Sequence, residues 1–179
     1  MGNKYNNQIV DDRLQVILNN EDFLNVYKKF GITVFSRTSI FDGLDKLLDE
    51  IQPEGVCVEI GTRFGLTSIL LSGYFDKVYT IDIDPNTKKN QILAYLGINN
   101  VEIFNVRDNE EKAHILKDKK FNFAYIDGDH KNDTLSDFEL VKHCGNVIFH
   151  EYGTSNEVTN FVNSMTPEKI VKTMAYVKT

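Results

Sequence analysis

The chain has 179 residues, of which 41% are hydrophobic and 26% charged, a size that suits one well-buried core better than two. Its 20 basic and 26 acidic residues give a formal net charge of −6, so the chain as a whole offers a phosphate backbone no long-range attraction. We therefore expect no nucleic-acid partner. No apolar stretch approaches a membrane span and the first residues lack a signal-peptide core, so we expect no membrane partner either. The two cysteines, Cys57 and Cys144, lack metal-ligand spacing, which indicates reduced thiols and a cytoplasmic location.

The N-terminal part of the chain shows helical periodicity and no strand pattern. We expect residues 1–38 to form a helical N-terminal extension or lid, with a possible break at Asn19 and Asn20. A second helix is predicted to begin with the capping-box pair Ser39 and Asp42 and to end near Pro53. Its apolar face consists of Ile40, Leu44, Leu47, Leu48 and Ile51.

From Val56 onward, apolar runs rich in β-forming residues alternate with helical patterns, which predicts βαβ units and a mostly parallel sheet. The predicted strands are Val56 to Ile60, Val78 to Ile83, Val101 to Asn105, Phe121 to Ile126 and Asn146 to His150. The predicted helix after the second strand has Asp84 as its cap, Pro85 in its first turn and Gly97 at its end.

Two further helices and a short C-terminal strand region complete the pattern. Leu135, Phe138 and Val141 recur at helical spacing before Gly145, which is placed to end the helix. Val158, Phe161, Val162 and Met165 form the apolar face of another helix. Residues 169–177 then predict a last strand or a very short hairpin.

The segment after the first predicted strand carries the strongest functional signal. Glu59 ends the strand, and Gly61 and Gly65 follow in a turn that opens a helical pattern. Glycine allows positive φ and close approach of the backbone to a ligand, which predicts a small-molecule site. The dinucleotide pattern G-x-G-x-x-G is absent. An acid at this point suits a ligand that carries positive charge near an adenosine, such as S-adenosylmethionine (SAM).

Acidic residues also follow the other predicted strands. In open α/β sheets, ligands bind at the carboxyl ends of the strands, near the point where the strand order reverses. Some of these acids have a second interpretation, because Asp commonly caps helices and closes turns there. The polar residues at the five strand ends are Glu59, Asp82, Asp108, Asp127 with Asp129 and His130, and His150 with Glu151.

These motifs resemble those of class I SAM-dependent methyltransferases over most of the chain, from about Arg37 to Phe161. The pattern Glu-x-Gly-x-x-x-Gly, with Asp82 at the end of the next strand, carries the resemblance. Residues 125–130 and 147–151 resemble small O-methyltransferases, whose relatives include macrocin-type sugar and catechol-type enzymes. The resemblance implies a Rossmann-like α/β fold with helices on both faces of a mostly parallel sheet, and one methyltransferase domain spanning residues 1–179.

The resemblance also implies how the cofactor SAM would be held. Gly61 and Gly65 would shape the loop under its methionine part, and Glu59 would hold its ammonium group directly or through water. Asp82 would accept both ribose hydroxyls, as a carboxylate can. Asp108 would face the adenine amino group, although it could equally cap the helix that follows.

For the methyl acceptor, the resemblance implies Mg²⁺ and a general base. Asp127 and Glu151 stand where metal-dependent relatives place magnesium ligands, and Asp129 or His150 would complete the shell. The chain departs from the catechol-type pattern, because Tyr152 replaces the usual amide and the acid before it is Glu. His130 would be the catalytic base, since imidazole can take a hydroxyl proton at neutral pH.

The function that we expect is SAM-dependent O-methylation of a small-molecule hydroxyl. A non-catalytic protein that binds SAM or its demethylated product on the same fold is the alternative. Methylation of DNA base amines is disfavoured, because Asp-Gly-Asp-His replaces the Asn/Asp-Pro-Pro-aromatic run of those enzymes. The missing glycine pattern argues against an NAD-dependent oxidoreductase.

Overall fold

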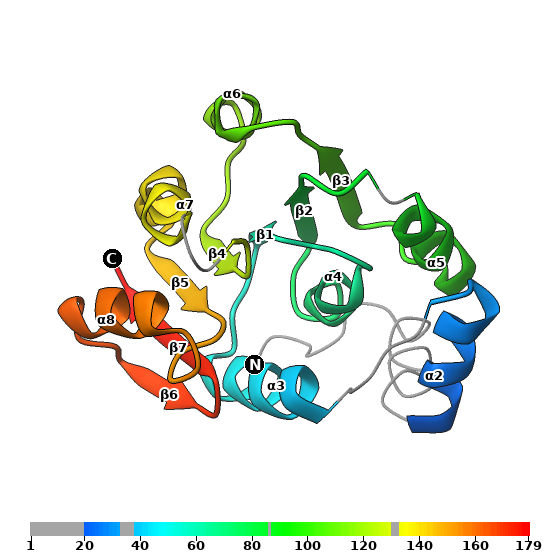
Figure 1. Ribbon diagram of the computed structural model, residues 1–179, viewed down its shortest axis with the longest axis horizontal. Coiled ribbons are helices and arrows are strands. Elements are labelled where there is room, and N and C mark those ends of the chain that lie inside the picture. The colour runs from blue at the N-terminus through cyan, green and yellow to red at the C-terminus, as the bar shows by residue number, and fades with distance from the viewer. Residues whose placement is uncertain (1–19, 33–37, 86, 130–132) are drawn as a thin grey trace.

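A seven-stranded sheet forms the centre of the protein. The computed structural model describes residues 20–32, 38–85, 87–129 and 133–179 (Figure 1). The strand order is β3-β2-β1-β4-β5-β7-β6, in which the first five strands are parallel and β7 is antiparallel to both of its neighbours. The strands are β1 (Val56–Ile60), β2 (Lys77–Asp82), β3 (Val101–Asn105), β4 (Phe123–Ile126), β5 (Asn146–Phe149), β6 (Lys169–Val171) and β7 (Met174–Lys178).

The strand order reverses at β1. From β1 the chain passes outward through β2 to β3, and then returns to the other side of β1 as β4. The register aligns Ile60 at the end of β1 with Ile81 of β2 and Ile126 of β4. The loops that follow these three strands therefore meet at one edge of the sheet, where open α/β folds bind ligands.

Helices cover both faces of the sheet. One apolar core includes residues from α2 (Asn20–Lys29), α3 (Thr38–Ile51), α4 (Leu66–Leu71) and α5 (Lys88–Leu96). The other includes residues from α6 (Asn109–Lys117), α7 (Thr134–Val141) and α8 (Asn156–Ser164), with a 3₁₀ turn at Lys142–Cys144. Cys57 of β1 lies in the first core and Val58 in the second, as the alternation of a strand requires.

The predicted α/β fold class is confirmed. The predicted limits of β1 and β3 are those observed, and β5 is one residue shorter than predicted. β2 is shifted by one residue, and β4 begins two residues later than predicted. The last strand region is a hairpin of β6 and β7, one of the two predicted forms.

Some local predictions were wrong. The helix after β2 begins at Lys88 rather than beside Pro85, because the Asp84 N–H donates to the Asp82 carboxylate and so belongs to the turn that ends β2. Leu135 of α7 is 56% exposed, whereas Asp137 is buried against Lys112 of α6. Phe138 and Val141 pack into the second core as predicted, so only Leu135 departs from the predicted face.

Most of the predicted extension, residues 1–38, lies outside the described residues. The described part includes α2, from which Val26 and Tyr27 pack into the first core. Ser39, the first residue of the predicted capping box, lies within α3, which begins at Thr38, so it is not the cap. Among the described helices, none has the length and apolar character needed to cross a membrane.

Candidate functional site

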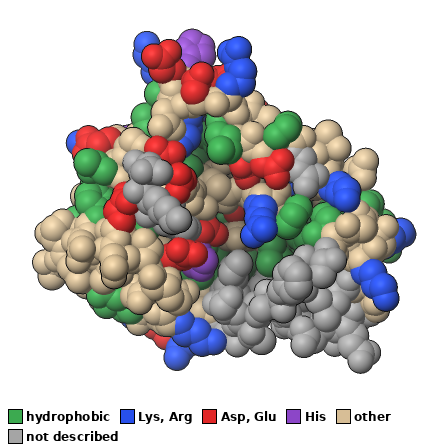
Figure 2. Space-filling model, viewed as in Figure 1, with side chains coloured by type: hydrophobic (Ala, Val, Ile, Leu, Met, Phe, Trp, Pro, Cys, Tyr) green, Lys and Arg blue, Asp and Glu red, His purple; other side chains and the backbone are tan. Residues whose placement is uncertain are grey.

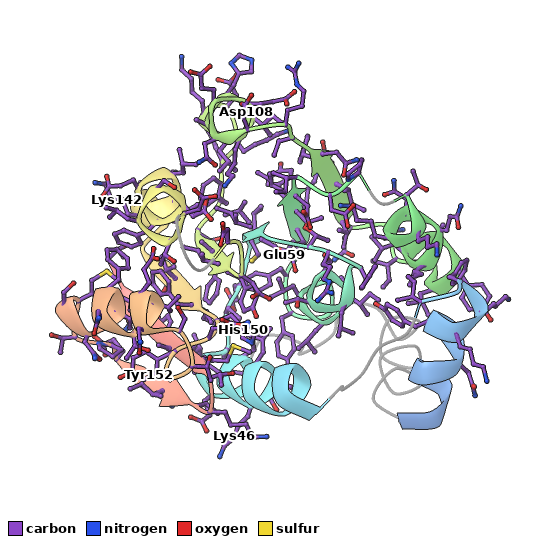
Figure 3. All side chains as sticks on the ribbon, in the orientation of Figure 1. Lys46, Glu59, Asp108, Lys142, His150 and Tyr152 are labelled. Atoms are coloured by element: carbon purple, nitrogen blue, oxygen red, sulfur yellow. The ribbon has the colours of Figure 1, made fainter. Side chains whose placement is uncertain are left out.

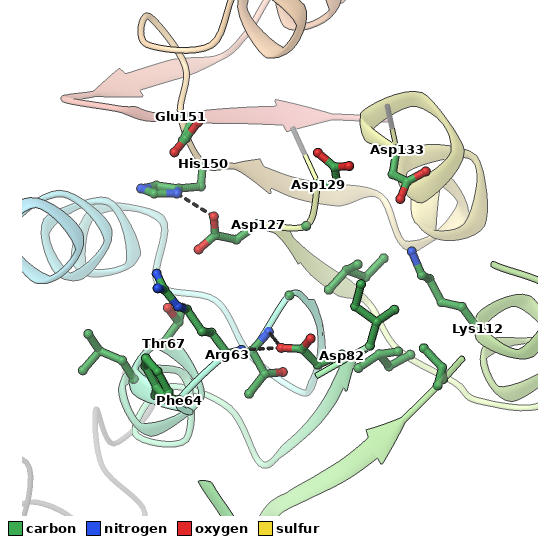
Figure 4. Close-up of a pocket in the computed structure, with 18 of the residues that line it drawn as sticks. Arg63, Phe64, Thr67, Asp82, Lys112, Asp127, Asp129, Asp133, His150 and Glu151 are labelled. Carbon is green, nitrogen blue, oxygen red and sulfur yellow. Dashed lines mark hydrogen bonds and ion pairs between the residues drawn. The ribbon is translucent and has the colours of Figure 1, made fainter. Parts of the chain in front are cut away.

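A cavity of about 720 Å³ opens at the carboxyl ends of the parallel strands (Figure 4). Gly61 after β1, Asp82 at the end of β2, Asp127 after β4 and His150 after β5 all line it. The space-filling view shows acidic side chains gathered around a hollow on this face (Figure 2). The cavity thus lies where the strand order reverses, and its volume is typical of small-molecule sites.

The loop of residues 61–65, here called the glycine loop, forms one wall of the cavity. Gly61 has φ +91°, and a Cβ atom there would collide with the carbonyl oxygen of Asp127. Gly65 has φ +79° and is the N-terminal cap residue of α4. Glycine is required at Gly61 both for its backbone angle and for the close approach of the loops after β1 and β4.

Asp82 fixes the glycine loop to the end of β2. Its carboxylate accepts hydrogen bonds from the backbone N–H groups of Thr62 at 2.8 Å, of Arg63, and of Asp84 at 2.8 Å. A carboxylate offers about four acceptor positions. Asp82 would therefore share its oxygens between the loop and any ribose diol that enters the cavity.

Glu59 lies beneath the glycine loop and is fully buried. The Ser68 hydroxyl of α4 donates to its Oε2, while its Oε1 has no hydrogen-bond partner among the described residues. Burial raises the pKa of Glu59 to about 8, opposed by the hydrogen bond of Ser68 and the nearby Thr80 hydroxyl and assisted by the negative charges of Asp127 and Asp82. The carboxyl is therefore largely protonated at neutral pH when the cavity holds no cation.

Asp127 and His150 meet at the opposite wall. The Nδ1 atom of His150 lies 2.6 Å from Oδ1 of Asp127, and this contact joins the ends of the neighbouring strands β4 and β5. Glu151 and Asp129 line the cavity beside the pair (Figure 4). The sequence predicted His150 only as a possible metal ligand and gave no indication that it pairs with Asp127.

These donors do not fit a magnesium site in their observed arrangement. Asp127 is engaged by His150, and Glu151 has φ +60°, in the left-handed region. Over the described parts of the chain, no three His, Cys, Asp or Glu side chains are grouped so that they could hold a metal ion.

Four predicted site residues do not line the cavity or lie outside the described residues. Glu59 is fully buried and is not a lining residue. Asp108 is exposed at the start of α6, where its side chain accepts the Glu111 N–H at 2.9 Å and caps the helix. Figure 3 shows Asp108 well apart from Glu59 and His150. Gly65 shapes the loop but is not a lining residue. His130 lies outside the described residues, so its predicted role as base stays a prediction.

The structure adds basic residues to the site that the motifs did not reveal. Arg63 lies inside the glycine loop and Lys112 comes from α6, and both line the cavity. The spacing of the two glycines predicted a ligand-binding loop that contains Arg63, but it did not predict that the Arg63 side chain lines the cavity. Lys112 pairs with buried Asp137, a contact between two helices that periodicity does not reveal.

Comparisons with known proteins give no match at the level of sequence. No protein-family model matches the chain, and no curated protein sequence matches it.

Solved structures, in contrast, match nearly the whole chain. An O-methyltransferase from Bacillus cereus in complex with S-adenosylhomocysteine (SAH) has a TM-score of 0.61 and 17% identity, with 97% of this chain and 91% of that chain covered. The O-methyltransferase TomG from Streptomyces achromogenes, involved in tomaymycin synthesis and solved with SAM, also has a TM-score of 0.61 and 17% identity, with coverage of 97% and 90%. An rRNA methylase from Streptococcus thermophilus has a TM-score of 0.57 and 18% identity, with coverage of 82% and 98%.

At these identities the likeness concerns the fold. The position of the cavity at the reversal of strand order agrees with the motifs found in the sequence. The chain therefore has the fold of the class I SAM-dependent methyltransferases.

Proposed function

We propose that this protein is a SAM-dependent methyltransferase. The observation that carries the proposal is the convergence of Asp82 and the glycine loop on one cavity at the reversal of strand order. Their fit to the cofactor is chemical as well as positional, because Asp82 supplies diol-accepting oxygens and buried Glu59 has an oxygen without a partner among the described residues. The structural neighbours crystallised with SAM or SAH support the same reading.

In this proposal, Asp82 binds the ribose hydroxyls and the glycine loop supports the methionine part of the cofactor. Glu59 receives its ammonium group, whose positive charge would favour the ionised carboxylate in the buried position. Asp108 has no part in this proposal, because its side chain caps α6 and does not line the cavity. When bound, SAM supplies an activated methyl group on a sulfonium, and the cavity's task is to align an acceptor with it and exclude water.

We propose a small-molecule hydroxyl as the acceptor. Two structural neighbours are O-methyltransferases, and the cavity walls carry Asp127, Asp129, Asp133 and Glu151, which disfavour a phosphodiester chain. His130 is the proposed base for the hydroxyl proton. The rRNA methylase among the neighbours makes RNA the competing acceptor that a test must include.

Two measurements in sequence test the function. Isothermal titration calorimetry with SAM and SAH is expected to show binding in the micromolar range. The absence of detectable binding for both ligands would overturn the proposal. Transfer of a radiolabelled methyl group is then measured against phenols, sugars and total RNA. Binding without transfer to any acceptor would favour the non-catalytic alternative, and transfer to RNA would correct the acceptor class.

A further inference from the structure

The cavity is strongly acidic, although the proposed cofactor ends in a carboxylate. Its described lining residues include the acids Asp82, Asp127, Asp129, Asp133 and Glu151. The methionine part of SAM carries an ammonium and a carboxylate, and these acids would repel the latter. A site for the whole cofactor therefore needs a cation near the glycine loop, where that part is proposed to lie.

One arginine and one lysine line the described part of the cavity, Arg63 and Lys112. Lys112 is already paired within the protein. Its ammonium forms an ion pair with Asp137, and the two side chains are only 6% and 1% exposed. Removing Lys112 from this pair would leave a buried carboxylate uncompensated, at a high cost. Lys112 is therefore a poor candidate for binding a ligand carboxylate.

Arg63 is available and is held in position. Its guanidinium carbon lies 5.2 Å from the centre of the Phe64 ring, and Arg63 has no ion pair with another described residue. Its backbone N–H donates to Asp82, and its φ of +46° fixes the residue in the left-handed region. Figure 4 shows the side chain extending from the loop toward the side where Asp127 and His150 lie.

We propose that Arg63 binds the carboxylate of the cofactor's methionine part. A guanidinium presents paired N–H donors that match the two oxygens of a carboxylate, and it is always charged. The strained backbone of Arg63, fixed by Asp82, couples this contact to the residue that binds the ribose. The inference rests on the proposed function, since it assigns one contact within that cofactor site.

The test compares SAH with two ligands that lack its carboxylate, one of which keeps the amino group. Wild-type protein, Arg63→Gln, Arg63→Lys and the control Arg107→Gln are titrated with SAH, decarboxylated SAH and 5′-methylthioadenosine. Arg107 is an exposed arginine outside the cavity that pairs with Glu111 at 3.1 Å, so its replacement matches the charge change. The melting temperature of each variant shows that it is folded.

We expect Arg63→Gln to weaken SAH binding by about 10- to 100-fold and to leave the two ligands without a carboxylate within about twofold of wild type. Arg63→Lys should recover part of the SAH affinity, and Arg107→Gln should change nothing. Unchanged SAH affinity, or an equal loss for all three ligands, would overturn the role of Arg63 alone. A wild-type protein that binds none of the three ligands would instead overturn the proposed function and this inference with it.

Discussion

Asp127 and His150 form a direct link between the ends of β4 and β5. Their Oδ1 and Nδ1 atoms lie 2.6 Å apart, and their side chains are only 19% and 14% exposed. Both residues line the cavity, so the link fixes the wall that faces the glycine loop. Two residues 23 positions apart in sequence thereby act as one structural unit.

Separate and combined replacement of this pair by alanine should show coupling. A half-buried polar group that loses its partner costs free energy, so the double-mutant cycle of Asp127→Ala and His150→Ala should give a coupling energy of about 1–3 kcal/mol. The coupling energy is obtained from the free energies of unfolding of the four proteins, measured in urea. The control His114→Ala, at an exposed position of α6, should change the free energy of unfolding by less than about 0.5 kcal/mol. Strict additivity of the two replacements would mean that the contact contributes nothing.

Gly61→Ala should destabilise the protein far more than the same change at another glycine with positive φ. The new Cβ atom would collide with the backbone of Asp127, which no side-chain movement can relieve. Gly145 has φ +82°, and a Cβ atom there meets nothing within 4 Å, so Gly145→Ala carries the backbone strain without the collision. We expect a loss of about 1–2 kcal/mol for Gly145→Ala and at least about 2 kcal/mol more for Gly61→Ala. Thermal and urea unfolding measure both, and equal losses would contradict the proposed collision.

Asp82→Ala should weaken SAH binding by about 1–3 kcal/mol, because the ribose hydroxyls lose their acceptor and the loop amides lose theirs. Calorimetry with SAH measures the effect. Asp76, exposed at the opposite end of β2, provides the control Asp76→Ala, which should bind SAH as wild type does. An unchanged SAH affinity in Asp82→Ala would reduce this residue to an anchor for the glycine loop.

The features that the sequence predicted well are those encoded locally. The apolar run Val56 to Ile60 has the length of a buried strand, and Gly97 follows the last apolar residue of α5, so their limits could be predicted. The glycine loop was recognisable because glycine at fixed spacing reports a backbone requirement, which the φ values of Gly61 and Gly65 bear out.

Contacts between elements could not be predicted in this way. The pairing of Lys112 with Asp137 depends on how α6 and α7 pack, and so does the exposure of Leu135. The amide partners of Asp82 depend on the path of a loop about 20 residues earlier, for which periodicity carries no information. Hydrophobic pattern fixes which elements form, whereas polar pairing depends on their final register.

The buried carboxyl of Glu59 should make stability pH-dependent. Its pKa is about 8 in the folded protein against 4.5 for an unperturbed glutamate. Between these values the native state binds more protons than the unfolded state, so the free energy of unfolding falls as pH rises, by at most about 1.4 kcal/mol per pH unit. The contribution is constant below about pH 4.5 and is fully lost above about pH 8.

Glu59→Gln removes this titration and keeps the shape of the side chain. The difference in free energy of unfolding between Glu59→Gln and wild type should therefore grow in favour of the variant from pH 5 to pH 8. Urea titrations at intervals of one pH unit measure this difference, with the exposed Glu110→Gln as control. Parallel pH profiles for wild type and Glu59→Gln would show that Glu59 titrates normally.

Magnesium should neither bind tightly to the free protein nor be needed for cofactor binding. Mg²⁺ requires near-octahedral oxygen ligands, whereas Asp127 is engaged by His150 and Glu151 is held in a left-handed backbone conformation. We expect calorimetry with MgCl₂ to show no saturable binding at millimolar concentration, and a chelator to leave SAH affinity unchanged. Saturable binding that disappears in Glu151→Gln, but persists in the exposed control Glu110→Gln, would restore the magnesium site that the family resemblance implies. Turnover with and without chelator then distinguishes a metal that joins only with the acceptor from one that has no part in the reaction.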